Sequence, residues 1–290
     1  MKSAPFSYVR PDSVQEALRV LGEHAGGARV LAGGQSLVPM LQMRLMQLDA
    51  LIDINLLEGL DEVRAAGAET VFGPLVRYAT IEKLALVSER LALLQCVTRF
   101  VGDPQVRNRG TIGGSLAQAD PSAEIPLPCL ALDATVVAAS VSVTREIPID
   151  DFLVSSYTTA LEAEEMITEI RFPLAPHHFA FLERNRKHND FAVINVAVVG
   201  RRSNDGAWSG LRIVLGGVND RAVLARDSAA SLEGTALEED AIGEAAHLAL
   251  DVIDPPSDIR ATAEYRRHLV PVYVRRALCK LRDDHQHAYA

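Results

Sequence analysis

Cysteine is scarce in this sequence of 290 residues. The three cysteines, Cys96, Cys129 and Cys279, are far apart and lie in apolar surroundings. Zinc and iron–sulfur sites need thiolates at close, regular spacing, so these positions predict buried, reduced thiols instead. The eight histidines lack the i, i+4 partner that a metal site on a helix needs. We therefore expect no metal centre in this chain.

Positive charge is also in short supply, because 38 acidic residues outnumber 29 basic ones and give a net charge of -9. Proteins that bind nucleic acid or anionic membranes present a concentrated basic patch, and none stands out. No uninterrupted apolar run approaches the ~20 residues that cross a membrane. Pro5 and Arg10 interrupt the N-terminus before an apolar signal segment can form. The sequence therefore predicts a cytoplasmic protein of roughly two domains.

Two short glycine pairs, Gly33-Gly34 and Gly113-Gly114, are the most informative motifs that are present. Each follows an apolar or β-branched lead-in, which indicates a junction between a strand and a turn. Without a Cβ, glycine reaches positive φ and lies against a ligand, so that several N–H groups converge on one anionic oxygen. Either pair alone is most often a simple turn. Two such loops in one chain suggest a single bound dinucleotide.

The first half of the chain is predicted to alternate helices with strands. Ser13 and Glu16 form a capping box, and apolar residues then recur at helical spacing over 14–21. Strands are expected at 30–32, 51–54 and 71–72. Residues 37–48 are expected to be helical or irregular, and Thr80 is expected to cap a helix over 81–94.

A long polar stretch surrounds the second glycine pair. Residues 103–124 are mostly small or polar, and their periodicity fits neither a helix nor a strand. Pro104 is expected to bar a helix just before the glycines. Because long loops without secondary structure usually serve a ligand, we expect residues 103–124 to form an irregular ligand-binding loop.

In the second half, β-branched residues between proline-bearing loops predict strands over 134–143 and 166–172. The loop from Pro173 to Pro176 is the expected domain boundary. Beyond it, an antiparallel meander with a turn at 203–206 is predicted to consist of strands 179–182, 191–199 and 211–218. Helices are then predicted at 238–250 and 259–282, the second interrupted at Pro271.

These motifs closely resemble the FAD-binding medium subunit of molybdenum hydroxylases, the carbon monoxide dehydrogenase and xanthine dehydrogenase family. The resemblance covers almost the whole chain and is carried by segments 30–37, 103–124, 157–159, 167–173, 190–192 and 264–269. It implies an α+β fold, in which a two-subdomain FAD-binding fold of the vanillyl-alcohol-oxidase (PCMH) type precedes a small C-terminal domain of antiparallel sheet and helices. The implied boundaries are FAD-binding subdomain 1 at 1–56, FAD-binding subdomain 2 at 57–175, and a C-terminal domain of the carbon monoxide dehydrogenase flavoprotein type at 176–290.

The resemblance also implies which residues hold FAD. Backbone N–H groups and hydroxyls of segments 32–36 and 111–115 would bind the pyrophosphate and neighbouring ribose or ribityl oxygens. Glu124 would accept a hydrogen bond from a ribose hydroxyl, Ile167 would lie near adenine through its main chain, and Phe191 would flank the isoalloxazine ring. Without the resemblance, Glu124 reads as a solvated loop acid and Phe191 as a core residue. The full implied set is Leu31, Ala32, Gly33, Gly34, Gln35, Ser36, Leu37, Thr111, Ile112, Gly113, Gly114, Ser115, Ala119, Glu124, Ile167 and Phe191.

Three positions depart from the family pattern. Gln35 stands where His is frequent, and Gln118 stands where His or Asn is frequent. Phe191 stands where some relatives carry Tyr, so a hydrogen bond from that hydroxyl to the flavin is not expected here. The polar character of the first two positions and the aromatic character of the third are kept.

The function implied by the resemblance is electron relay. The chain would carry FAD beside a large molybdopterin-binding subunit and a small 2Fe-2S subunit, in a complex expected to be a dimer of heterotrimers, and pass electrons to an external acceptor. A flavin suits this role because it handles electrons singly and in pairs. No catalytic side chain is expected from this chain. A stand-alone FAD-dependent oxidoreductase and a scaffold that has lost its cofactor are the alternatives, and the substrate and the acceptor stay open.

Overall fold

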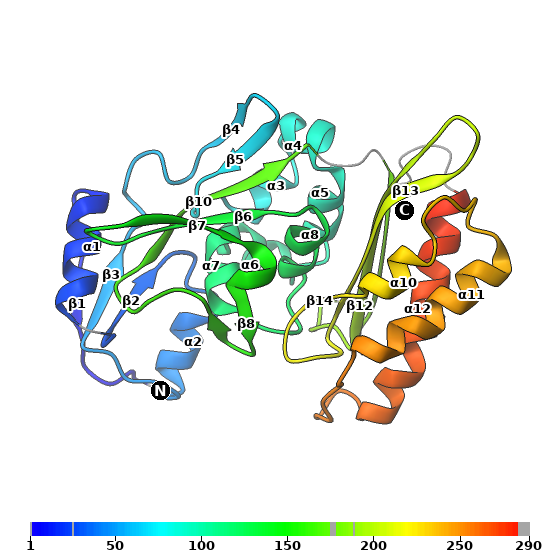
Figure 1. The fold of residues 1–290 in the computed structure, drawn as a ribbon. Helices are drawn as coiled ribbons and strands as arrows, with labels where there is room; N and C mark the ends of the chain where they lie inside the picture. Colours follow the sequence, from blue (N-terminus) through cyan, green and yellow to red (C-terminus); the bar gives the residue numbers. More distant parts are fainter. Residues whose placement is uncertain (1, 25, 175–177, 188, 284–290) are drawn as a thin grey trace.

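The structure is a computed structural model that describes residues 2–24, 26–174, 178–187 and 189–283. Its elements form three units in chain order, each built around its own sheet (Figure 1). A fourth, two-stranded sheet pairs β8 (Leu153–Ser155) with β9 (Thr158–Thr159). Within the described residues, no helix is long and apolar enough to cross a membrane.

The first unit is a small parallel sheet with one covering helix. Its strands lie in the order β1-β3-β2, with β1 at Ser7–Val9, β2 at Ala28–Leu31 and β3 at Ala50–Asp53. Helix α1 (Val14–Glu23) begins where the Ser13 hydroxyl accepts from the Glu16 N–H at 3.2 Å, which confirms the predicted helix start. Helix α2 (Leu37–Gln42) follows the first glycine pair. The predicted strands at 30–32 and 51–54 are confirmed within a residue or two.

The second unit is an antiparallel sheet in the order β4-β5-β10-β6-β7. Strand β10 lies at its centre although it is the last of the five in the chain, and it pairs with β5 on one side and β6 on the other. Its strands are β4 at Val63–Ala66, β5 at Glu69–Phe72, β6 at Thr135–Ala139, β7 at Thr144–Pro148 and β10 at Met166–Pro173. The predicted strands in these regions are confirmed, with 134–143 divided between β6 and the turn before β7.

The helices of the second unit are shorter and more numerous than predicted. In place of one helix over 81–94 there are α3 (Tyr78–Ile81), α4 (Ala85–Arg90) and α5 (Ala92–Thr98). Extended Arg77, not Thr80, precedes α3. Leu91, with φ of -139° and ψ of 49°, separates α4 from α5. Both helices bury apolar side chains on either side of the break, Val87 in α4 and Leu93 and Leu94 in α5.

The prediction of an irregular loop over 103–124 was wrong. Helix α6 (Pro104–Arg109) begins with Asp103, whose carboxylate accepts from the Val106 N–H at 3.1 Å. Pro104 occupies the first turn, where its missing N–H needs no partner, so it starts a helix and does not bar one. Helix α7 (Ile112–Gln118) follows and contains the second glycine pair. The remaining helices of this unit are α8 (Pro126–Ala131) and α9 (Ile149–Phe152).

The third unit is the predicted antiparallel meander, which the structure confirms. Its sheet has the order β11-β12-β13-β14, with β11 at His178–Arg184, β12 at Ile194–Arg202, β13 at Trp208–Gly216 and β14 at Val223–Leu224. The following helices are α10 (Arg226–Ala230), α11 (Glu239–Leu248), a 3-10 turn (Ala249–Val252) and α12 (Ala263–Asp283). Helix α12 runs through Pro271, so the predicted interruption is absent, and Val270 and Val274 on its buried face pack into the core of this unit.

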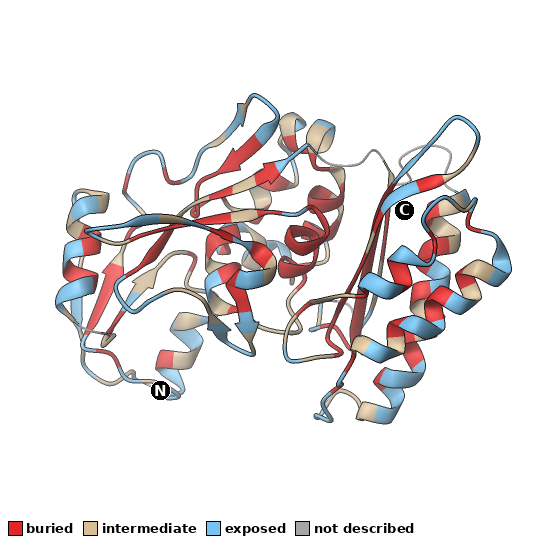
Figure 2. Cartoon of the chain, in the orientation of Figure 1, coloured by how far each residue is buried: buried red, intermediate tan, exposed pale blue. Residues whose placement is uncertain are grey.

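The third sheet is covered on both faces. Figure 1 shows α10, α11 and α12 on its outer face, while α5 and α8 lie between it and the second unit. Burial follows the same division, since the facing surfaces of these helices and strands are buried (Figure 2). The rings of Phe100 and Phe181 meet edge-to-face at 4.9 Å across this junction. One continuous apolar cluster therefore joins the second and third units.

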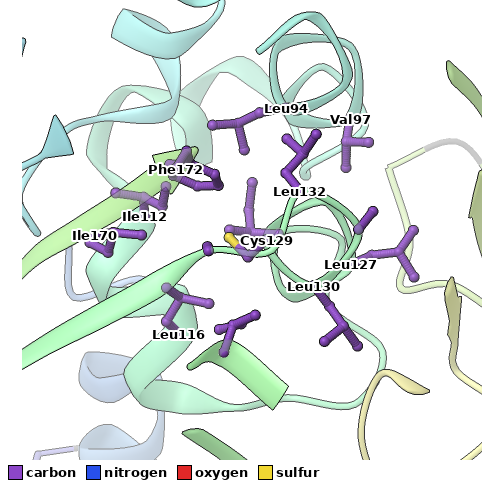
Figure 3. Close-up of a cluster of buried hydrophobic side chains, with 14 of the residues drawn as sticks. Leu94, Val97, Ile112, Leu116, Leu127, Cys129, Leu130, Leu132, Ile170 and Phe172 are labelled. Carbon is purple, nitrogen blue, oxygen red and sulfur yellow. The ribbon is translucent and has the colours of Figure 1, made fainter. Parts of the chain in front are cut away.

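The centre of that cluster lies around α7 and α8. Figure 3 shows Ile112 and Leu116 of α7 beside Ile170 and Phe172 of β10, with Cys129 of α8 among them. Cys129 is fully buried, as predicted, whereas the other two cysteines are half-buried, and all three are free thiols. The described residues hold no group of three or more His, Cys, Asp or Glu side chains placed to share a metal ion. Helix α7 is thus held in place by the packing of Ile112 and Leu116 against the core.

Candidate functional site

A cavity of about 500 Å³ brings the two glycine motifs together. Segment 32–37 forms one wall, the start of α7 forms another, and residues 189–191 before β12 close it from the third unit. Its volume is within the range of cavities that hold cofactors. The implied site residues that line it are Ala32, Gly33, Gly34, Gln35, Ser36, Leu37, Thr111, Gly114, Ser115, Glu124 and Phe191.

The first glycine pair turns the chain between β2 and α2. A Cβ at Gly33 would stand 2.3 Å from the carbonyl oxygen of Arg109, so only glycine lets this loop approach the end of α6. Gly34 has φ of +70°, a conformation that other residues adopt at a cost. The backbone N–H groups of residues 33–37 donate to no acceptor in the described chain. They border the cavity and are available to a ligand.

The second glycine pair is arranged differently. Thr111 is extended and begins α7, and its hydroxyl accepts from the Gly114 N–H at 3.1 Å. The N–H groups of Ile112 and Gly113 donate to the carbonyl oxygens of Val76 and Pro74. The Ser115 N–H donates to the Thr111 carbonyl oxygen. The amides of 112–115 are therefore engaged within the protein, and of the donors expected over 111–115 only the Thr111 N–H has no acceptor in the described chain.

The two glycines of this second pair also have separate surroundings. A Cβ at Gly113 would stand 2.5 Å from Cβ of Pro74 and 2.7 Å from its backbone, so this glycine lets α7 pack against the segment before α3. A Cβ at Gly114 would meet the Thr111 hydroxyl at 2.8 Å and otherwise only Ala32 at 3.8 Å. Gly113 thus serves packing, and Gly114 keeps the cavity wall flat.

Five implied residues do not line this cavity. Ile112 and Gly113 lie beneath it, and Leu31 lines a neighbouring groove on the other side of segment 32–35. Ala119 is left-handed, with φ of 48°, and its carbonyl oxygen accepts from the Tyr157 N–H at 2.9 Å. Ile167 is buried in β10. These five residues would therefore act on a ligand in this cavity only indirectly, by positioning the residues that line it.

Glu124 is a buried carboxyl at the cavity wall, with 7% of its surface exposed. Burial, together with repulsion from Glu183, raises the pKa of Glu124 to about 8. Burial likewise raises the pKa of Glu183 to about 7. In the described chain no other side chain donates to the Glu124 carboxyl. Its own backbone N–H is the hydrogen-bond donor that acts on it. A buried carboxyl that faces a cavity without a side-chain donor is suited to a hydroxyl-bearing ligand.

Phe191 lies at the cavity mouth, in the segment before β12, and is 46% exposed. It is therefore not a core residue, and the predicted strand start at 191 was three residues early. The guanidinium of Arg260 lies over its ring, 4.7 Å from the centroid. Several other lining residues were not predicted from the sequence, because they are single positions in unrelated segments; they include Arg29, Met40, Val101 and Gly102.

Comparison with known proteins agrees with this geometry. Residues 4–175 match the family described as the FAD binding domain in molybdopterin dehydrogenase, and residues 179–281 match the CO dehydrogenase flavoprotein C-terminal domain. The alpha subunit of the 6-hydroxypseudooxynicotine dehydrogenase complex of Paenarthrobacter nicotinovorans is 37% identical over 97% of this chain and 95% of its own length. The carbon monoxide dehydrogenase medium chain of Hydrogenophaga pseudoflava is 36% identical, over 94% and 96%.

Solved structures agree as well. Carbon monoxide dehydrogenase from Hydrogenophaga pseudoflava superposes with a TM-score of 0.93 at 36% identity, over 97% of this chain and 98% of the other. Quinoline 2-oxidoreductase from Pseudomonas putida 86 gives 0.92 at 34% identity, over the same shares. Fold and site thus define an FAD-binding flavoprotein with a C-terminal antiparallel domain. The chain belongs to the FAD-binding medium subunits of the molybdenum hydroxylases, and it is an oxidoreductase subunit that carries FAD in an electron relay.

Proposed function

We propose that the cavity between the two glycine motifs is where this chain holds FAD. The observation that carries the proposal is the row of uncommitted N–H groups at 33–37, which offers the pyrophosphate several donors at once. The hydroxyls of Thr111 and Ser115 approach from the opposite wall. The second motif thus contributes hydroxyl groups and a flat surface, in place of the backbone donors expected from its sequence.

The other lining residues suit the remaining parts of FAD. Glu124 would accept from a ribose hydroxyl, which would give its buried carboxyl a second donor besides its own backbone N–H. Phe191 offers a partly exposed aromatic face at the mouth, against which a flavin ring would pack. The chemistry that FAD would supply when bound is the transfer of electrons singly or in pairs. The residues that line the cavity would hold and orient it.

The matched relatives are named as subunits or medium chains of dehydrogenase complexes. We propose that this chain likewise assembles with a large molybdopterin-binding subunit and a small 2Fe-2S subunit, as a dimer of heterotrimers in the cytoplasm. Its domains would then end at residues 56 and 175. Electrons would enter from the iron–sulfur subunit and leave to an external acceptor.

The experiment is co-expression of the full chain with its sister subunits, followed by measurement of FAD per chain and of complex mass. We expect one FAD per chain and a mass near that of two heterotrimers. Gly114→Leu, which fills the cavity wall, should reduce FAD content strongly while the complex still forms. Gly243→Leu is the control, because nothing lies within 4 Å of a Cβ at that position.

Unchanged FAD in Gly114→Leu would refute the site. A chain that stays monomeric, holds FAD and oxidises a small substrate alone would instead favour the stand-alone oxidoreductase. Complete absence of FAD from the co-expressed wild-type complex would favour the scaffold.

A further inference from the structure

Arg260 is a cation held at the mouth of the cavity by the third unit. Its guanidinium lies 4.7 Å from the centroid of the Phe191 ring, within the range of a cation–π contact. Arg260 also lies close enough to Tyr157, another lining residue, to act on its pKa in the direction of a nearby positive charge. The positive charge therefore stands beside two aromatic side chains of the site.

The segment that carries Arg260 is firmly fixed. The Asp258 carboxylate accepts from the backbone N–H of Arg260 at 2.8 Å and of Ala261 at 3.0 Å. Both oxygens of Asp258 also accept from Arg266, at 2.9 Å each. Arg266 is 1% exposed, and its other terminal nitrogen donates to the carbonyl oxygens of Val193 and Gly217. Arg260 is thus anchored to the same strand ends that place Phe191.

The acidic groups near this end of the cavity already have other partners. Asp258 lies 3.5 Å from the Arg260 guanidinium, but it is shared with Arg266, which has no other ion pair in the described chain. Asp120 accepts from the Tyr157 hydroxyl at 3.3 Å, and Asp190 accepts from the backbone N–H of Phe191. Arg29 also lines the cavity, and among the described residues Arg260 is the cation that lies over the Phe191 ring at the mouth.

We propose that Arg260 is a positioning residue of the flavin site: it fixes the Phe191 ring at the mouth and supplies a positive charge there that favours the reduced, more negative flavin. The inference rests on the proposed function. Adding electrons to the flavin increases its negative charge, and a fixed cation within several ångströms stabilises that state more than the oxidised one. Arg260 would thereby help draw electrons toward the flavin.

The test measures the ratio of reduced to oxidised FAD at equilibrium with a redox dye, in the co-expressed complex, per FAD actually bound. Arg260→Gln should lower that ratio about tenfold, and Arg260→Lys should restore most of it, because the charge returns. Raising the salt concentration should shrink the difference. The control is Arg276→Gln, which removes a cation stacked 5.6 Å from the Tyr273 ring on α12, outside the cavity lining, and should leave the ratio unchanged.

An unchanged ratio in Arg260→Gln at normal FAD content would overturn the proposal. So would an Arg260→Lys variant that behaves like Arg260→Gln, because the role would then be packing alone. An equally large change of the ratio in Arg276→Gln would also overturn it, because the effect would then come from the net charge of the protein and not from the place of Arg260. Wild-type complex without FAD would refute the proposed function instead, before any ratio is measured.

Discussion

The two glycine pairs border one cavity from opposite sides and contribute to it by different means. At Gly33-Gly34 the backbone turns with positive φ and leaves its N–H groups uncommitted. At Gly113-Gly114 the backbone enters a helix whose first amides donate to the protein, and Gly113 is pressed against Pro74. The first pair is thus shaped for a ligand, whereas one glycine of the second is required by packing. A glycine motif alone does not distinguish a binding loop from a close-packed helix start.

Alanine at Gly113 is expected to give the largest loss of stability. Its Cβ would overlap both the ring and the backbone of Pro74, and neither can move without disturbing the core under α7. We expect the free energy of unfolding to fall by about 3 kcal/mol, measured by urea denaturation. Gly243→Ala, at an open helical position of α11, should instead raise it by about 0.5 kcal/mol. Equal stability of Gly113→Ala and wild type would show that the contact between residue 113 and Pro74 leaves room for a methyl group.

Glu124 follows the second motif and should make the FAD-free chain sensitive to pH. Its pKa is about 8 when folded and near 4.5 when unfolded, so the folded state binds the extra proton and stability falls as pH rises between these values. Glu124→Gln should reduce that fall by on the order of 2 kcal/mol, measured by urea denaturation at both ends of the range. Glu183, with its own raised pKa, would retain a smaller fall. Exposed Glu58→Gln is the control, and an unaltered pH profile in Glu124→Gln would contradict the assignment.

Gly33→Ala is expected to affect both stability and FAD binding. Its Cβ would press on the Arg109 carbonyl oxygen. Gly33 is buried, but Gln35 and Ser36 of the same loop are exposed, so we expect the loop to give way more readily than the core. We expect a loss of about 1.5 kcal/mol in the free energy of unfolding and, because the N–H groups are displaced, clearly reduced FAD content. Normal FAD content with reduced stability would show that this loop does not bind FAD.

Gly114→Ala should change stability least and is the sharpest test of the comparison. Its methyl group would enter the cavity and meet only the Thr111 hydroxyl closely, while alanine favours the helix, so the free energy of unfolding should shift by less than about 0.5 kcal/mol. FAD binding should weaken about tenfold, measured by fluorescence titration. If Gly113→Ala and Gly114→Ala proved alike in both measurements, the division between packing and binding would be wrong.

Much of the fold could be predicted from local patterns. The helix after Ser13 and the strands of the meander were found because one face of each element is apolar at a regular spacing. Helices α6 and α7 were missed because each spans fewer than two turns, too few for a period to show. Their signals were the caps Asp103 and Thr111, together with a proline at the first helical position.

By itself, the sequence determined most of the element types, apart from helices α6 and α7, and the two glycine motifs. Through its resemblance to a family it also gave the expectation of FAD. Only the tertiary structure decided which backbone donors are free, because an N–H group is committed by whatever carbonyl packs beside it, as Pro74 and Val76 do for α7. It also decided that Glu124 is buried and that Arg260, far along the chain, covers Phe191. Burial and proximity between distant segments follow from the packing of the sheets and leave no periodic trace in the chain.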